Sequence, residues 1–199
     1  MFEVRIHGRG GQGVVTASEL LALAAFNDGL QAQAFPSFGS ERMGAPVTAF
    51  CRIDQTPIRR REPIAEPDAV VVQDPTLLHH VDVFGGLSPG GYVLINSSRP
   101  PAELGLEELH DRLAPGRVLT VAASEIARAR LGRPIPNVAL LGGLIALIDV
   151  VALKALEQAI GERFTGDAAD ANLQAASDAH SQAMAQLASL ATMAGPGDG

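Results

Sequence analysis

"IHGRGGQGVV", residues 6–15, joins two different sequence patterns. Before it, residues 2–7 alternate apolar and polar side chains, which is the spacing of a β-strand. After it, apolar side chains recur at positions 14, 17, 21, 24 and 25, which is the spacing of one face of a helix. The glycines lie between the two patterns. The stretch therefore predicts a strand, a tight turn and a helix in succession.

The same alternation continues along the chain. Further strands are expected at residues 30–35, 69–73, 92–96 and 117–122. Helices are expected from the Asp74-Pro75 pair to Gly85-Gly86, around residues 103–113, and from a cap at Ser124 to Gly132. Repeated strand-helix alternation predicts an α/β, Rossmann-like fold with a mostly parallel sheet and helices on both faces.

Two segments depart from this alternation. Residues 47–53 and 57–60 have the pattern of two strands separated by a short polar turn, which predicts a β-hairpin insertion. Residues 137–163 are predicted to be helical, with Gly142-Gly143 in their apolar middle. Because each glycine costs a helix roughly 1 kcal/mol relative to alanine, this pair indicates that another element packs very close to it.

The pattern divides the chain into three parts. Residues 1–166 are expected to form one α/β domain, and residues 167–194 a helical C-terminal extension. The extension is rich in alanine and glutamine and has a weak apolar stripe, which favours a surface helix that docks on a partner. The last residues, 195–199, have the composition of a disordered tail.

Composition limits the possible functions. The 199 residues are 47% hydrophobic, enough for one substantial core, and the net charge of −7 argues against nucleic-acid or anionic-membrane partners. A single cysteine, Cys51, excludes disulfides and cysteine-ligated clusters within this chain. The N-terminus has no signal-peptide pattern, and the most apolar segment, residues 138–153, is interrupted by Asp149. We therefore expect a cytoplasmic protein.

The glycine stretch satisfies the spacing G-x-G-x-x-G, with Gly8, Gly10 and Gly13 in the required places between a strand and a helix. Such a turn can present backbone N–H groups and a positive helix end to an anion. A dinucleotide site also needs an acid at the end of the second strand, and this chain has Phe35-Pro36-Ser37 there. Tight strand-helix packing or a contact with a substrate phosphate is therefore favoured over an NAD site.

A second unusual stretch, "AFPSFGSERMGAPVTAF", occupies residues 34–50. In a parallel sheet, a loop that follows a strand lies on the ligand side, beside the glycine turn. An ordinary solvated surface loop is the alternative, but the length of this one and its phenylalanine and methionine content favour a functional surface. The five histidines show no metal-ligand spacing, and no nucleophilic triad pattern is present, so no catalytic or metal-binding residue is predicted.

Four blocks of the sequence together resemble the gamma subunit of the 2-oxoacid:ferredoxin oxidoreductases, with pyruvate synthase the closest match. The blocks are "HGRGGQGVVTASELLA", "AFPSFGSERMGAPVTAFCRI", "EPDAVVVQDPTLL" and "GRPIPNVALLGGL". The resemblance covers about residues 1–160, and the chain departs from the compact family pattern after about Gly166.

The resemblance implies a subunit of an enzyme that converts a 2-oxoacid and coenzyme A to acyl-CoA and carbon dioxide and reduces ferredoxin. It also implies that thiamine diphosphate, Mg and [4Fe-4S] clusters belong to partner subunits of alpha, beta and delta type. In agreement, the thiamine motif of the family is absent here. The residues expected to line the approach of coenzyme A, or to brace the catalytic subunit, are Gly8, Gly10, Gly11, Gln12, Gly13, Ser37, Ser40 and Arg42.

Several alternatives stay open from sequence alone. A stand-alone NAD(P)-binding reductase would use the same glycine turn, and a purely structural assembly subunit would use the two unusual stretches only as an interface. The same type of subunit could also serve an aryl- or branched-chain 2-oxoacid enzyme, or one with another electron acceptor. Pyruvate is the expected substrate, with 2-oxoglutarate, branched-chain and aryl 2-oxoacids left open.

Overall fold

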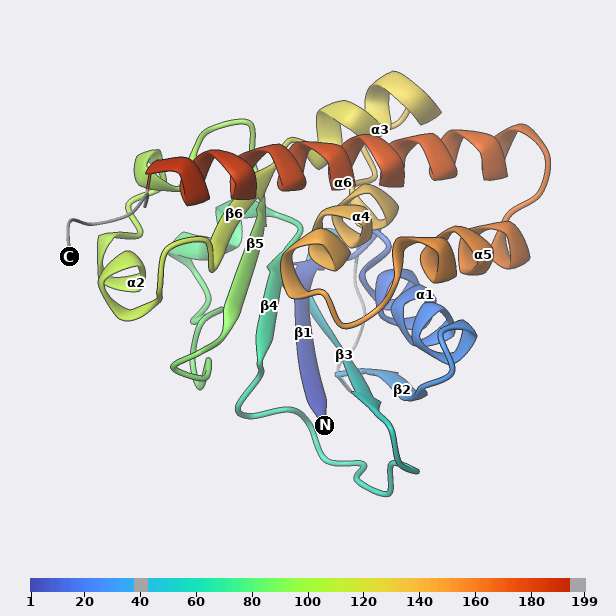
Figure 1. The fold of residues 1–199 in the computed structure, drawn as a ribbon, viewed down its shortest axis with the longest axis horizontal. Coiled ribbons are helices and arrows are strands. Elements are labelled where there is room, and N and C mark those ends of the chain that lie inside the picture. The colour runs from blue at the N-terminus through green and yellow to red at the C-terminus, as the bar shows by residue number, and fades with distance from the viewer. Residues whose placement is uncertain (38–42, 194–199) are drawn as a thin grey trace.

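The computed structural model describes residues 1–37 and 43–193 (Figure 1). Two of the expected site residues, Ser40 and Arg42, and the expected tail at 195–199 lie outside the described residues. The core element is a six-stranded sheet in the order β2-β3-β1-β4-β5-β6. Its strands are β1 (Phe2–Arg9), β2 (Gln31–Pro36), β3 (Pro46–Asp54), β4 (Ala69–Val72), β5 (Tyr92–Asn96) and β6 (Val118–Val121).

Six α-helices and two 3₁₀ helices surround this sheet within the described part of the chain. The α-helices are α1 (Val14–Asn27), α2 (Glu107–Arg112), α3 (Ala123–Leu131), α4 (Asn137–Ile148), α5 (Leu153–Arg163) and α6 (Asp167–Met193). The 3₁₀ helices are η1 (Pro75–His79) and η2 (Pro101–Glu103). None of the described helices is long and apolar enough to cross a membrane.

The sheet is parallel through β1, β4, β5 and β6, and β3 is inserted antiparallel between β1 and β2. The mostly parallel α/β fold is therefore confirmed. The hairpin predicted from residues 57–60 is wrong, because β3 pairs along one edge with β1 and along the other with β2. Residues 57–60 have no free edge of β3 to pair with, and they form a largely exposed connection.

Helices cover both faces of the sheet, as predicted, but not equally. One face carries a large core built from α1, α4, α5 and α6, with α6 running across the top of the view in Figure 1. The other face of β4, β5 and β6 is covered only by short helices and turns, whose apolar side chains form a smaller cluster. Strand alternation explains the split on β4, since Ala69 and Val71 join the larger core while Val70 and Val72 join the smaller one.

Two of the predicted helices differ in extent. The helix expected from Pro75 to Gly85 is only the short η1. Leu77, Val83 and Leu87 all bury in the smaller cluster, but the chain between them follows turns rather than a continuous helix. The polar helix expected around residues 103–113 is divided between η2 and the short α2.

Two predicted helix boundaries also differ. The single helix expected over residues 137–163 is broken at Asp149, which takes a left-handed conformation with φ of 50° and separates α4 from α5. Ser124 does not cap α3, because it lies inside the first turn. Its N–H donates to Asn96 Oδ1 at 3.0 Å, and its Oγ accepts from Asn96 Nδ2 at 2.8 Å. The predicted end of α3 at Gly132 is confirmed, with φ of 71°.

The close contact predicted at the glycine pair is confirmed. A Cβ atom on Gly142 would lie 2.0 Å from the carbonyl oxygen of Ala176. Small side chains on α6 meet α4 at this contact, and all of them are fully buried: Ala175, Ala176, Ala179 and Ala183. α6 therefore buries its inner face in the same core as the sheet, while the division into residues 1–166 and 167–194 stays a prediction.

The Gly142 contact predicts a large difference between two glycine substitutions in helices. Gly142→Ala should lower the free energy of unfolding by about 2 to 4 kcal/mol, because the new methyl group overlaps backbone that cannot move aside locally. Gly161→Ala on α5 is the matched control, since its Cβ meets nothing within 4 Å. It should be neutral or stabilising by up to about 1 kcal/mol. Denaturant unfolding measures both, and equal effects would contradict the packing argument.

Candidate functional site

The glycine turn connects β1 to α1 at the edge of the sheet where the parallel strands end. A Cβ on Gly8 would lie 2.6 Å from Val14 Cγ2 and 3.2 Å from Gln73 Cβ. Gly11 and Gly13 have positive φ angles of 94° and 71°. The sequence uses glycine here both for close strand-helix packing and for a backbone conformation that other residues rarely adopt.

The turn lies at the switch point of the sheet. From β1 the chain continues towards β2, on one side, and from β4 it continues towards β5, on the other. In open α/β sheets, ligands bind outside the carboxyl ends of the strands at such a point. The fold thus places the glycine turn where a ligand site is expected.

Part of the 34–50 loop lies directly on the turn, as the sequence predicted. Gly10 donates its N–H to Ala45 O at 2.9 Å, and Gly44 donates to Gly10 O at 3.1 Å. Both β1 and β2 run antiparallel to β3, so the loop after β2 opens at the same edge as the turn. We call the turn at residues 8–13 together with residues 43–45 the turn ledge.

Two side chains from the 34–50 loop can be placed relative to this edge. Ser37 is exposed at the end of β2, where its N–H donates to Thr48 O at 2.8 Å. Met43 lies on the turn ledge and is 87% exposed, which is unusual for a large apolar side chain. A Cβ on Gly11 would lie 2.6 Å from Met43 Sδ. The exposed methionine favours a contact with another molecule at this ledge.

An internal polar network fixes the turn to the end of β4. The Arg9 guanidinium donates to Asp74 Oδ2 at 3.1 Å, to Thr76 Oγ1 at 2.8 Å and to Gly44 O at 3.1 Å. Gln12 Nε2 donates to the same Asp74 oxygen at 2.9 Å. Sequence reasoning missed the role of Asp74, which it interpreted only as a helix cap. Asp74 does cap η1, since Oδ1 accepts from Thr76 N at 3.0 Å, but its second oxygen anchors the turn.

The network affects the charge of Asp74. Burial acts to raise the pKa of its carboxyl, but hydrogen bonds from Thr76 and Gln12 and the nearby Arg9 charge outweigh burial and hold the pKa below its ordinary value. Asp74 is therefore ionised at neutral pH and neutralises Arg9. The guanidinium of Arg9 is consequently engaged within the protein.

The N–H groups of the turn are partly used by the protein itself. Arg9 N donates to Gln12 Oε1 at 2.8 Å, and Gln12 N donates to Arg9 O at 3.0 Å. The first intrahelical bond of α1 is from Ala17 N to Gly13 O, so the N–H groups of residues 14–16 precede it. They border a hollow of about 320 Å³. The arrangement suits an anion, but some of the turn's backbone N–H groups are bonded within the protein. Fewer of them can therefore face an anion than the glycine spacing alone suggested.

The strand order weakens the dinucleotide alternative further. In a dinucleotide-binding fold, the second strand lies next to the first and places its acid near the ribose. Here β3 separates them, so the end of β2 lies two strand spacings, roughly 10 Å, from β1. The position also lacks an acid.

The buried titratable groups offer no reacting side chain. Burial and the Arg5 charge lower the pKa of His7 to about 4, and Arg5 Nε donates to its Nε2 at 3.0 Å. Burial raises the pKa of Cys51 to about 12, so it is no thiolate at neutral pH. Among residues 1–37 and 43–193, no group of three or more histidine, cysteine or acidic side chains could hold a metal ion. The described residues therefore do not fit an iron-sulfur cluster or a metal-bound cofactor.

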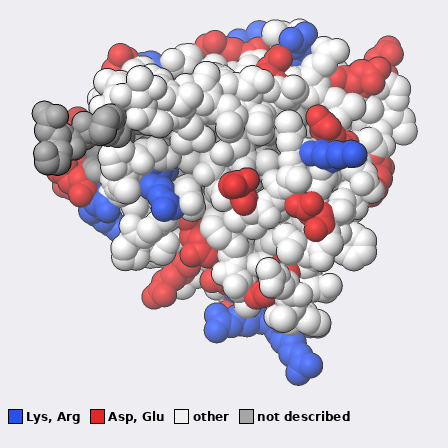
Figure 2. Space-filling model, in the orientation of Figure 1, with Lys and Arg blue, Asp and Glu red and all other residues white. Residues whose placement is uncertain are grey.

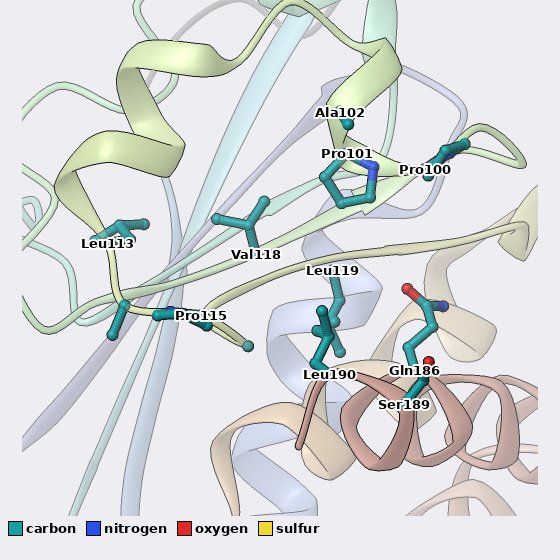
Figure 3. Close-up of a pocket in the computed structure, with 12 residues that line it drawn as sticks. Pro100, Pro101, Ala102, Leu113, Pro115, Val118, Leu119, Gln186, Ser189 and Leu190 are labelled. Atoms are coloured by element: carbon teal, nitrogen blue, oxygen red, sulfur yellow. The ribbon is translucent and has the colours of Figure 1, made fainter. Parts of the chain in front are cut away.

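A larger hollow of about 450 Å³ lies elsewhere, at the open edge of β6 (Figure 3). Residues 100–102, residues 113–116, 118 and 119 and the C-terminal half of α6 surround it, and its lining is mainly apolar. Of its polar groups, Gln186 is engaged, because Nε2 donates to Thr120 O. Residues 181–193 of α6 carry no charge, and Figure 2 shows a broad uncharged surface over this region. The hollow is therefore suited to apolar contact rather than to catalysis.

Comparisons with known proteins identify close relatives. A family model described as pyruvate ferredoxin/flavodoxin oxidoreductase matches residues 3–182. The pyruvate/ketoisovalerate oxidoreductases common subunit gamma of Thermococcus kodakarensis is 50% identical over 179 residues, which cover 90% of this chain and 95% of that protein. Pyruvate synthase subunit PorC of Methanothermobacter marburgensis is 46% identical over 176 residues, covering 88% and 94%.

A solved structure agrees with these relatives. The crystal structure of pyruvate oxidoreductase subunit PORC from Thermotoga maritima has a TM-score of 0.76 and 36% identity, and the match covers 90% of this chain and 95% of that one. The family match continues past residue 160 into α6, which is further than the four sequence blocks indicated.

The Asp74 network predicts a pH-dependent effect on stability. Asp74→Asn should lower the free energy of unfolding at pH 7 by about 1 kcal/mol, because Arg9 and Gln12 lose an ionised acceptor. Since the folded pKa is lowered, this contribution is present above the ordinary value of 3.8 and disappears as the pH falls through the folded value. Denaturant unfolding at pH 7 and below pH 3.8 tests it. Asp111→Asn, an exposed carboxylate on α2, is the control; a difference of equal size at both pH values would refute the role.

Proposed function

The chain belongs to the pyruvate ferredoxin/flavodoxin oxidoreductase family, and on that basis we propose that it is the gamma subunit of a multi-subunit 2-oxoacid:ferredoxin oxidoreductase. The observation that carries this proposal is likeness over almost the whole length of gamma-type relatives, up to 95% of their chains. The assembled enzyme would oxidatively decarboxylate a 2-oxoacid with coenzyme A to acyl-CoA and carbon dioxide.

In this proposal the reacting groups lie in other subunits. Thiamine diphosphate with Mg and the [4Fe-4S] clusters would belong to alpha, beta and delta-type partners, and ferredoxin would accept the electrons. The support is chemical: the chain has a single cysteine, which is fully buried, and the described residues offer no metal-binding group. The isolated chain would therefore be inactive. We further propose a cytoplasmic location, without nucleic-acid or membrane partners.

The contribution of this chain would be assembly and part of the coenzyme A side of the active site. The turn ledge, with Ser37 and with Ser40 and Arg42 from outside the described residues, would face the diphosphate of coenzyme A or the catalytic subunit. The free N–H groups at the start of α1 and the exposed Met43 support this assignment. The residues of the turn ledge would bind and orient coenzyme A or the catalytic subunit, and the ion pair of Asp74 with Arg9 would hold the ledge rigid.

Pyruvate is the proposed substrate, because the similar proteins are named for pyruvate enzymes. A second candidate follows from the Thermococcus kodakarensis relative, which is named as common to pyruvate and ketoisovalerate oxidoreductases. One gamma subunit of this kind would serve both a pyruvate and a branched-chain 2-oxoacid enzyme.

Assembly with redox partners is the first test of this function. The full chain, affinity-tagged and expressed in its native host, should copurify with iron- and thiamine-containing subunits. The complex should reduce ferredoxin only when 2-oxoacid and coenzyme A are both present. Comparing pyruvate with 2-oxoisovalerate separates the two substrate candidates. A colourless lone chain, or a complex without 2-oxoacid-dependent reduction, would contradict the proposal.

The coenzyme A role has its own test in the assembled enzyme. Arg42→Ala should raise the KM for coenzyme A by about tenfold with little change in kcat, because the loss of one charge-assisted contact to a phosphate costs about 1.4 kcal/mol or more. Arg59→Ala, in the exposed connection after β3, is the control and should leave KM unchanged. An unchanged KM in the Arg42 variant would assign the loop to subunit contact instead.

A further inference from the structure

A second polar hollow, of about 230 Å³, lies next to the start of α1 and has no role in the proposal above. It shares Gly11, Gly13 and Thr16 with the hollow of about 320 Å³ beside the turn ledge. Its other walls come from the end of α3 and the segment after it, the start of α4, the end of α5 and the start of α6. The lining residues that matter here are Gly13, Thr16, Arg133, Asn137, Arg163 and Asn172. No carboxylate is among the lining residues.

Two helix N-termini meet at this hollow. Asn137, the first residue of α4, donates from Nδ2 to Gly13 O, the cap of α1, at 3.4 Å. A Cβ on Gly13 would lie 2.4 Å from that same amide nitrogen, so only glycine allows the approach. Neither helix has an acidic residue in its first turn. The positive ends of two helix dipoles therefore come together, and neither helix supplies a negative side chain of its own to compensate them.

Two arginines add to this positive charge. Arg133 and Arg163 are exposed, and neither makes a hydrogen bond or ion pair with another residue in the described part of the chain. Arg163 only lies over the ring of Phe164, at 5.6 Å. The protein as a whole carries a net charge of −7. Two guanidinium groups that lie beside two helix N-termini give this side of an acidic protein a local positive potential, which attracts anions.

A buried polar side chain also lines the hollow. Asn172 is only 5% exposed, and its one hydrogen bond to a described residue runs from Nδ2 to Ala168 O at 2.8 Å. Nδ2 has a second hydrogen, which it donates to none of the described residues. A buried amide that lines a hollow and keeps an unused N–H can donate it to an oxygen atom of a bound anion.

We propose that this hollow binds a phosphoryl group. Proteins commonly bind phosphate with arginine guanidinium groups and at helix N-termini, and here two arginines line one space beside the starts of α1 and α4. At about 230 Å³ the hollow is smaller than the roughly 300 Å³ or more of pockets that enclose a whole small molecule. It therefore holds free phosphate, or one phosphate of a larger nucleotide whose remainder lies outside. The site goes beyond the proposed function, since its charged groups are Arg133 and Arg163 and it needs neither Arg42 nor Met43; it shares only Gly11 and Gly13 with the turn ledge.

The test measures phosphate binding by the full chain. Thermal unfolding is followed against inorganic phosphate at constant ionic strength set with chloride, because a ligand of the native state raises the midpoint by mass action. The double variant R133Q/R163Q should weaken the apparent affinity by about tenfold or more. R128Q on α3 is the matched control, because Arg128 is an exposed arginine that does not line the hollow, and it should bind like the parent.

A second probe distinguishes the two phosphate sources. Adenosine 3′,5′-bisphosphate should bind more tightly than inorganic phosphate if the phosphate belongs to a nucleotide, and no more tightly if the site takes free phosphate. Either result supports the site, provided that the double variant loses the binding. Absence of phosphate binding, or equal binding by the double variant, would overturn it. If phosphate does not bind, the 2-oxoacid-dependent activity of the complex is still expected. The phosphate site and the proposed function can therefore be contradicted independently.

Discussion

The structure depends on glycines, which have no side chain, at the β1–α1 turn. Gly8 allows Val14 and Gln73 to meet β1, and Gly13 allows the first residue of α4 to contact the cap of α1. Any Cβ at Gly13 would overlap Asn137 and would also sit in an unfavourable left-handed conformation. One short stretch thus fixes the strand, its helix and a second helix that is more than a hundred residues distant in sequence. The same contact brings two helix N-termini together, which is the origin of the positive hollow.

A second constraint is the antiparallel β3. By inserting between β1 and β2, it moves the end of β2 away from the turn while keeping the loop after β2 at the same edge. The turn is then occupied by residues of that loop and by the side chains of Arg9, Gln12 and Asp74. The resulting surface is a rigid ledge with an exposed methionine, which is better suited to meeting another molecule than to enclosing adenine. This distinction separates the chain from nucleotide-binding proteins with the same glycine spacing.

Much of the fold could be predicted from the sequence, because apolar periodicity is a local signal. Strands β1, β4, β5 and β6, helix α1 and the end of α3 at Gly132 all follow from it. The misplaced elements are those decided by distant neighbours. Residues 57–60 have strand composition but find no free edge of β3. Pro75 begins only a short 3₁₀ helix, after which turns place Val83 and Leu87 in the smaller cluster. Asp149 breaks the helix predicted over residues 137–163; in the sequence it stood out only as a charge that interrupts an apolar segment.

The sequence by itself determined the α/β class, the glycine turn, the close contact at Gly142 and, through four ordered blocks, the family. Each of these rests on residue type and local spacing, which can be seen in the sequence before any distant part of the chain is placed. Only the tertiary structure decided that Asp74 anchors the turn, that Gly13 meets Asn137, and that Arg133 and Arg163 lie at the same hollow. The physical reason is that these contacts join residues far apart along the chain, which come together only when the elements that carry them pack against one another.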